Sequence, residues 1–352
     1  MFYKISSFFN KFWFLVLIVI HLCSCDNDNQ NPKPDISDIQ VEKVNIIRLE
    51  KLMKGASGEN YVQVYSKIEQ QHPLVFKSYY SNFWGLDPED SLHSVNVFDS
   101  LYVNTSGNEW MNRLLDSVLM IYDNMADVEK DMEKAFTYYK YYFPDSSLPQ
   151  LYTYIGPFVY QTLIDDSTMG IELDMYMGKN FGYYGSFENN MPQYITVRFE
   201  RPYIVVNVMQ SLVDGYVFSM EADATLLDEI IKQGKILYYL DCMLPDMEDS
   251  LKIGFTNQQL EWCNSNSGEI WKFLAGQELL FSKKIGDIRR YAEEAPTSMG
   301  MPEESPGRAS VWTGWQIVRA YMREHPEITL MQLFNEPDGL KILKDSGYRP
   351  EN

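Results

Sequence analysis

The sequence predicts an α+β fold, in which one mostly helical domain carries a small inserted β-sheet. Three observations lead to this prediction. Apolar residues recur at three- and four-residue steps over residues 109–142, short segments rich in β-branched and aromatic residues lie between residues 151 and 199, and helical patterns return after residue 220. Because no internal repeat or long linker follows residue 40, residues 41–352 are expected to form a single domain.

The first 24 residues have the pattern of a lipoprotein signal peptide. Lys4 and Lys11 precede an unbroken apolar run at residues 12–20, which is too short to cross ~30 Å of hydrocarbon as a helix. Leu22-Cys23-Ser24-Cys25 follows and resembles a bacterial lipobox. Cys25 is therefore the predicted lipidation site, where several acyl chains such as palmitate would together anchor the mature chain to a membrane. An uncleaved signal anchor and an ordinary signal peptide cut elsewhere remain the alternatives.

Residues 25–40 are predicted to be the acylated cysteine and a flexible tether, because residues 26–35 are polar and include two prolines. The whole chain has a net charge of −19, and removal of the two signal-peptide lysines leaves 28 basic against 49 acidic residues, or −21. This acidity argues against tight nucleic-acid binding, since a polyanion would be repelled. We expect lipid, not charge, to hold the chain at its membrane.

The elements before residue 200 are predicted in chain order from their periodicity. Residues 41–50 alternate enough to form a first strand, and residues 60–86 have a helical pattern. Residues 109–142 predict one long amphipathic helix or two in tandem, whose Met, Tyr and Phe side chains we interpret as core. Three further strands are predicted at residues 151–160, 170–177 and 194–199.

The elements after residue 220 are predicted to be helices. Residues 222–243 are apolar on most sides, which indicates a buried central helix. Two capping-box patterns, Thr256-x-x-Gln259 and Thr329-x-x-Gln332, open a helix through residue 274 and a last short helix. Ser305-Pro306 places a capping residue before a proline and predicts a helix that starts there.

The usual enzyme signatures are missing, and neither a metal nor another cofactor is predicted. The sequence has no G-x-S-x-G, no Walker loop and no G-x-G-x-x-G. Its mature part has three scattered histidines, His72, His93 and His325, whereas a zinc site needs several imidazoles or thiolates together. The acid pairs Glu172/Asp174, on one face of a predicted strand, and Asp165-Asp166, in a turn, are interpreted as solvated groups; a two-carboxylate hydrolase is the alternative.

Two further pairs of residues leave alternatives open. Cys242 and Cys263 could form a disulfide in an oxidising envelope, or remain two buried thiols. Arg308 and Arg319 lie eleven residues apart, about three helical turns, and so on nearly one face of the helix predicted after Ser305. They could clamp an anion, but we favour salt bridges to the acidic surface.

Several segments, taken in order, are similar to the gliding motility lipoprotein B (GldB) family of the Bacteroidetes. These segments are KYYFP at 140–144, LPQLYTYI at 148–155, GIELDMYMG at 170–178, GKILY at 234–238, MLPD at 243–246, SPGR at 305–308 and WTGWQIV at 312–318. The resemblance implies a cell-envelope lipoprotein of the gliding apparatus that acts through other gliding and secretion envelope proteins. It also implies a link to surface adhesin movement and type IX secretion. Of the two membranes, we favour the periplasmic face of the outer membrane over the inner membrane.

The order of strand, central helix and capped C-terminal helix also resembles that of zincin-like metallopeptidases, which carry H-E-x-x-H on the central helix. The residues in register are Asp228, Glu229 and Lys232. Glu229 matches the catalytic base, but Asp228 and Lys232 replace the two histidines, and a charged lysine cannot ligate zinc. We therefore expect a degenerate, metal-free site with an Asp228–Lys232 ion pair, and a non-catalytic protein. The alternative is an envelope hydrolase, peptidase-like, with an unrecognised or degenerate active site.

Overall fold

The computed structural model describes residues 33–350 except 55–59, 84–108, 157, 159, 166, 186–190 and 214–222. The signal peptide, Cys25 and His93 lie outside the described residues. Residues 35–352 group into one unit by their contacts, separate from residues 1–34. Within the part of the chain that is described, no helix has the length and apolarity needed to cross a bilayer.

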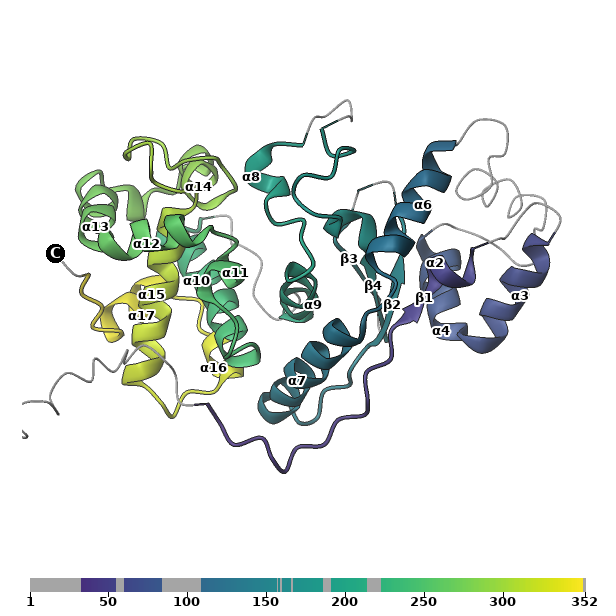
Figure 1. The fold of residues 1–352 in the computed structure, drawn as a ribbon. Coiled ribbons are helices and arrows are strands. Elements are labelled where there is room, and N and C mark those ends of the chain that lie inside the picture. The colour runs from purple at the N-terminus through teal and green to yellow at the C-terminus, as the bar shows by residue number, and fades with distance from the viewer. Residues whose placement is uncertain are drawn as a thin grey trace, which may run out of the picture. The chain divides into compact units, whose positions relative to one another are not determined.

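A four-stranded mixed sheet has the strand order β1–β2–β4–β3 (Figure 1). Its strands are β1 (Ile47–Arg48), β2 (Gln150–Tyr154), β3 (Thr162–Asp165) and β4 (Thr168–Glu172). β2 pairs in parallel with both β1 and β4, whereas β3 and β4 form an antiparallel hairpin. The small sheet among many helices confirms the predicted α+β class.

The helices occupy most of the remaining described chain. Before the C-terminal part they are α2 (Leu49–Leu52), α3 (Tyr61–Gln71), α4 (Pro73–Phe76), a π-helical segment (Lys77–Phe83), α6 (Glu109–Ile121), α7 (Ala126–Tyr142), α8 (Gln193–Thr196) and α9 (Tyr203–Val213). The C-terminal helices are α10 (Leu226–Met243), α11 (Asp249–Ile253), α12 (Asn257–Ser265), α13 (Ser267–Gly276), α14 (Ile285–Ala292), α15 (Ala309–Glu324), α16 (Leu330–Phe334) and α17 (Gly339–Asp345). Helix α9 contacts both α10 and the strands β3 and β4, and so connects the helices to the sheet.

Two apolar clusters cover opposite faces of the sheet, because successive strand residues point to opposite sides. Leu151 and Ile171 belong to the larger cluster, which includes α6, α7, α9, α10 and α15. Tyr152 and Tyr154 belong to the smaller cluster with Tyr79 and other residues of α3, α4 and the π-helical segment. The apolar stripe of residues 109–142 lies in the larger cluster wherever it is described, so its interpretation as core is confirmed.

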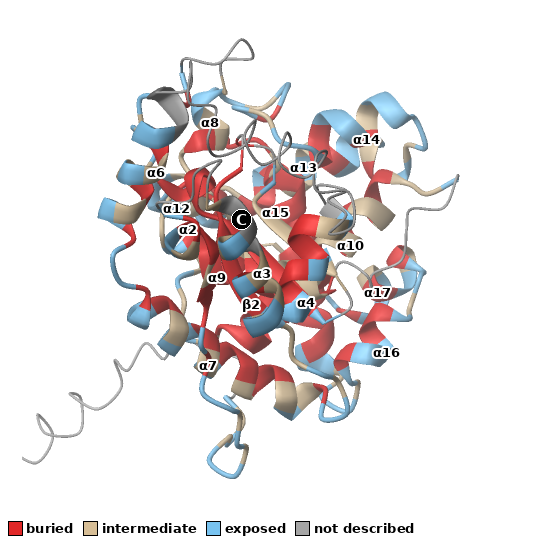
Figure 2. Ribbon diagram, turned by 90° about the vertical axis from the view of Figure 1, so that its right-hand side faces the viewer, coloured by how far each residue is buried: buried red, intermediate tan, exposed pale blue. Residues whose placement is uncertain are grey.

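Helices α10 and α15 cross at the centre of the larger cluster, and nearly every residue in the first three turns of α15 is buried (Figure 2). The crossing is close because two glycines meet there. A Cβ atom built on Gly314 would lie 2.1 Å from the carbonyl oxygen of Ile230, and one on Gly234 would lie 2.6 Å from the carbonyl oxygen of Gly314. Any larger residue at either position would force the two backbones apart.

The predicted strands are only partly confirmed. The segment at residues 41–50 pairs as a strand over two residues, because the backbone N–H groups of Val44 and Ile46 donate to Glu133 and Glu129 of α7 instead of to a neighbouring strand. The strand predicted at 151–160 ends at Tyr154, and the one at 170–177 ends at Glu172, where a 3₁₀ turn (Leu173–Tyr176) follows. The strand at 194–199 is wrong: its first residues form α8.

The predicted helices are mostly confirmed. Residues 60–86 are helical as far as Phe83, and residues 109–142 form two helices in tandem. Thr256 and Thr329 both make the predicted capping boxes. The helix through residue 274 is divided into α12 and α13, and α17 follows α16, so the helix opened by Thr329 is not the last. Helices α8, α9, α11 and α14 and strand β3 were not predicted.

The helix start at Ser305-Pro306 is wrong, since α15 begins at Ala309. Pro306 instead forms an isolated antiparallel bridge with Thr297. Arg308 occupies the N-cap position with a φ of 62°, in the left-handed region that side chains other than glycine rarely adopt. The residue therefore lies before the helix, not on its face.

Candidate functional site

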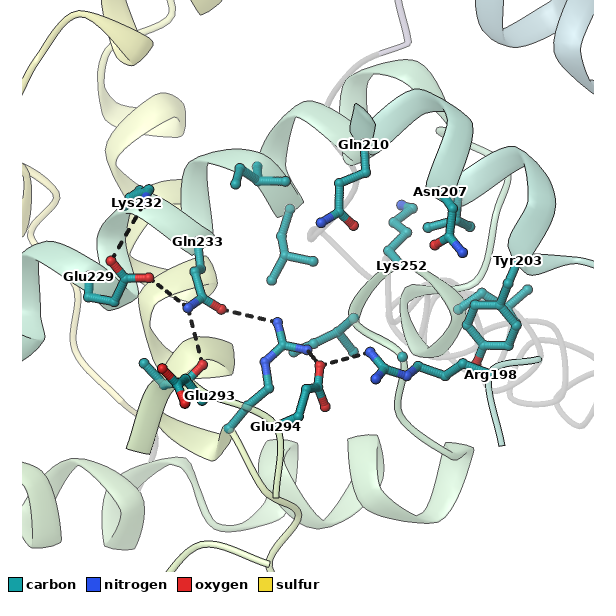
Figure 3. A pocket seen from close by; sticks show the side chains of 18 residues that line it. Arg198, Tyr203, Asn207, Gln210, Glu229, Lys232, Gln233, Lys252, Glu293 and Glu294 are labelled. Atoms are coloured by element: carbon teal, nitrogen blue, oxygen red, sulfur yellow. Dashed lines mark hydrogen bonds and ion pairs between the residues drawn. The ribbon is translucent and has the colours of Figure 1, made fainter. Parts of the chain in front are cut away.

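A polar cavity of about 560 Å³ lies among α9, α10, α11 and the segment that follows α14 (Figure 3). Its polar and charged lining residues are Arg198, Tyr203, Asn207, Gln210, Glu229, Lys232, Gln233, Lys252, Glu293, Glu294 and Arg308. Two residues of the predicted peptidase-like motif, Glu229 and Lys232, are among them. The cavity therefore contains part of the peptidase-like motif that the sequence predicted.

Gln233 organises the α10 side of the cavity. Its Nε2 donates to Glu229 Oε1 at 2.9 Å and to the carbonyl oxygen of Ala292 at 3.1 Å, and its Oε1 accepts from Arg308 Nη2 at 3.2 Å. Glu229 Oε2 is buried, makes no hydrogen bond with the described residues, and lies 3.7 Å from Lys232 Nζ (Figure 3). Thus Oε1 of Glu229 accepts a hydrogen bond from Gln233, and Oε2 forms an ion pair with Lys232.

Asp228 is separated from the other two motif residues. It is the N3 residue of a capping box, and its Oδ2 accepts from the backbone N and Oγ1 of Thr225 at 2.9 and 2.6 Å. Its Oδ1 accepts from the backbone N of Gly339 at 3.1 Å. The predicted Asp228–Lys232 ion pair is wrong, because the start of α10 uses the Asp228 carboxylate as a cap and Lys232 pairs with Glu229.

Metal ligands are not gathered in the described residues. There, no group of three or more His, Cys, Asp or Glu side chains is placed to hold a metal ion. His325 is 3.5 Å from Glu327 and 3.3 Å from the carbonyl oxygen of Asp345, which are surface contacts next to α15.

Two arginines meet on one carboxylate oxygen at the far side of the cavity from Lys232. Arg198 Nη1 and Arg308 Nη1 donate to the same atom, Glu294 Oε1, at 2.8 and 2.6 Å. Burial lowers the pKa of Arg308, and the Glu294 charge opposes that effect. Arg198 and Glu294 were not predicted, because they come from segments about a hundred residues apart and no local pattern marks either one.

Arg319 belongs to a different, buried network. Its Nε and Nη2 donate to Oδ2 and Oδ1 of Asp241, both at 2.7 Å, and its Nη1 donates to Asp249 Oδ2 at 2.8 Å. Its guanidinium also lies 3.7 Å from the ring centroid of Trp315, whose Nε1 donates to Asp241. Salt bridging is therefore the right interpretation for Arg319, but the partner Asp241 is buried, not part of the acidic surface.

Lys252 completes this network. Its side chain is 4% exposed, and its Nζ donates to Asp241 Oδ1 at 2.9 Å and to Asp249 Oδ1 at 3.3 Å. Burial alone disfavours the charge of Arg319, yet the two carboxylates hold its pKa above the ordinary value. Two cations and two carboxylates thus neutralise one another inside the protein, which indicates a structural role.

Glu172 and Asp174 are fully buried, so their interpretation as solvated groups is wrong. Asp174 accepts from the backbone N of Gly156 and Phe158 at 3.0 and 3.2 Å, and Glu172 Oε2 accepts from the backbone N of Tyr160 at 2.9 Å. Burial and the Glu172 charge raise the pKa of Asp174 well above its usual value. The pair holds the backbone of the segment after β2, a role the alternating pattern did not predict.

Cys242 and Cys263 are both buried free thiols, which decides between the two alternatives for this pair. Burial raises the pKa of Cys242 to about 12, and it also raises the pKa of Cys263. Since the thiolate is the reactive form, neither cysteine is suited to act as a nucleophile.

Of the comparisons with known proteins, the one with protein families finds a match. A family model described as gliding motility protein GldB matches residues 29–350. No curated protein and no solved structure matches the chain. The comparisons therefore support the first of the two resemblances and give no support to the peptidase-like one.

Proposed function

Since this chain belongs to the gliding motility protein GldB family, we propose that it is a non-catalytic lipoprotein of the cell envelope that serves the gliding apparatus through protein partners. The observation that carries the proposal is the extent of the family match, which includes almost all of the chain after the lipobox. A link to surface adhesin movement and type IX secretion is part of the same proposal.

The contacts of the motif residues support a role without catalysis. Asp228 is committed to capping α10, and Lys232 places an ammonium group, not an imidazole, beside Glu229. The charged groups of the cavity largely pair with one another. Binding to partner proteins is then the simplest use of the acidic domain, which the lipid at Cys25 would hold close to a membrane surface.

The proposed location is the outer membrane, at its periplasmic face. Crosslinking in intact cells, followed by separation of the two membranes, would test location and partners together. Envelope proteins of the gliding and secretion machinery should be recovered with the outer-membrane fraction. Crosslinks formed in the inner membrane alone would contradict this location.

Replacement of Cys25 by serine should abolish lipidation, because the hydroxyl of serine cannot take the place of the thiol that receives diacylglycerol. We expect Cys25→Ser to lose incorporation of labelled palmitate completely and to accumulate as an uncut precursor that retains its signal peptide. Metabolic labelling followed by gel electrophoresis measures both effects.

The sequence offers a matched control for that experiment in Cys23, two residues earlier. Cys23→Ser keeps a small residue at its position, so the label and the processing should both persist. Equal labelling of the Cys25→Ser variant and the wild-type chain would place the lipid elsewhere and remove the proposed anchor.

One observation favours the alternative function, an envelope hydrolase. Glu229 Oε2 is buried and makes no hydrogen bond with the described residues, while the Glu229 side chain lines the cavity. A general base needs a carboxylate oxygen that is free to accept a proton from water or substrate. The two functions differ in whether the Glu229 charge is needed, and Glu229→Gln separates them.

A further inference from the structure

We propose that the cavity binds a carboxylate-bearing ligand between Arg198 and Arg308, in the place that Glu294 occupies in the free chain. The two guanidinium groups come from separate segments and converge on one carboxylate oxygen at 2.8 and 2.6 Å. This binding site goes beyond the motility role and does not depend on it.

The two arginines have donors to spare. A guanidinium carries five N–H donors and prefers to bind a carboxylate through two parallel hydrogen bonds. With the described residues, the Arg198 guanidinium makes one hydrogen bond, to Glu294, and the Arg308 guanidinium makes one to Glu294 and one to Gln233. Arg319, in contrast, makes a paired bond to Asp241 and a further bond to Asp249. Arg319 thus uses all three of its guanidinium nitrogens, whereas Arg198 uses one and Arg308 uses two, so these two arginines have donors left for a ligand.

The backbone is built to hold both arginines in place. Arg308 keeps its left-handed φ of 62° although a glycine would adopt that conformation without strain. Arg198 lies across Gly254, where a Cβ atom would come within 2.5 Å of its Cδ. Arg308 thus occupies a backbone position that favours glycine. Arg198 needs the glycine at position 254, because a larger residue there would collide with its side chain.

The charge of this corner of the cavity favours an anion. Glu294 is one carboxylate facing two guanidinium groups, which leaves an excess positive charge in a chain of net charge −19. Glu229 does not offset this excess, because it is paired with Lys232. A ligand carboxylate in the place of Glu294 would keep the same balance and could use the donors that Glu294 leaves free.

Glu294 is the most exposed of the three side chains that meet in this corner of the cavity. Its side chain is 38% exposed, against 22% for Arg198 and 14% for Arg308, and it lies on the irregular segment between α14 and α15. Across the cavity, Asn207 and Gln210 of α9 present amide groups, and the Gln210 amide makes no hydrogen bond with the described residues (Figure 3). These amides could contact the rest of the ligand.

Removal of the internal carboxylate should make the site easier to fill, because a competing group multiplies the apparent affinity by the fraction of molecules in which it leaves the site open. We expect Glu294→Gln to bind succinate about tenfold more tightly than the wild-type chain does. Glu269→Gln is the matched control: it removes the same charge from an exposed side chain of α13 that pairs with Lys272 and does not line the cavity. Isothermal titration measures both, with circular dichroism to verify the fold.

Two further variants and a second probe complete the experiment. Arg308→Gln or Arg198→Gln, each added to Glu294→Gln, should abolish binding, and either double variant suffices if the other fails to fold. A blocked tripeptide of glycine, glutamate and glycine distinguishes the source of the carboxylate: if it binds, the site accepts a carboxylate from a protein chain, and if only succinate binds, the ligand is a free acid. Equal affinity of the two single variants for both probes, or binding that survives loss of either arginine, would overturn the proposal.

Discussion

Replacement of Asp241 by alanine should lower the free energy of unfolding by about 3–5 kcal/mol, because it leaves buried cations without their partner. Asp241 accepts from Arg319, Lys252 and Trp315, and both cations are largely removed from water. Asp249 alone cannot neutralise two positive charges. Denaturant unfolding followed by circular dichroism measures the loss.

An exposed ion pair of the same chain provides the comparison. Glu269 pairs with Lys272 at 2.7 Å, and both side chains are well exposed on α13. Glu269→Ala should therefore change the free energy of unfolding by no more than about 0.5 kcal/mol. If Asp241→Ala were as mild as Glu269→Ala, the buried network would not hold α10, α11 and α15 together as we infer.

Replacement of Gly314 by alanine should cost about 3 kcal/mol of unfolding free energy, at the upper end of what overpacking in a core costs. The added methyl would lie 2.1 Å from the carbonyl oxygen of Ile230 and 2.5 Å from its carbonyl carbon. Both atoms belong to the backbone of α10, so no side chain can turn aside. The two central helices would have to separate, and thermal and denaturant unfolding would measure the effect.

Gly276 is the matched control for this substitution. It ends α13, and a Cβ atom there would meet nothing within 4 Å. Gly276→Ala should be neutral or should stabilise the protein by about 0.4–1 kcal/mol, since alanine restricts the unfolded chain. Equal stabilities of the two alanine variants would contradict the close crossing of α10 and α15.

The sequence predicted those elements whose causes are local. The capping boxes at Thr256 and Thr329 are formed by residues three apart, and the apolar stripe of residues 109–142 depends on helical periodicity alone. The strand at residues 194–199 failed because β-branched and aromatic residues favour a strand only where a partner strand is available. That segment has none and begins as α8.

Of the candidate site, the sequence predicted two residues on one helix and singled out Arg308, but with the wrong partner, Arg319. Glu229 and Lys232 lie one turn apart on α10, and the resemblance marked them both. Arg198, Glu294 and Arg308 meet through the packing of separate segments, which no spacing in the sequence records. Burial of Glu172 and Asp174 was missed because both carboxylates are bound by backbone N–H groups of residues 156–160, and no side-chain pattern records a contact with the backbone.

The role without catalysis is tested most directly by the Glu229 charge. Glutamine at position 229 keeps an oxygen that can accept the hydrogen bond from Gln233, so the fold should persist. The measurement is the colony spreading of a strain that lacks its own copy of this protein and is complemented with the Glu229→Gln variant. A non-catalytic lipoprotein predicts spreading equal to that of the wild-type complement. Loss of spreading, with the variant folded, lipidated and present at wild-type amounts, would contradict it and favour the hydrolase.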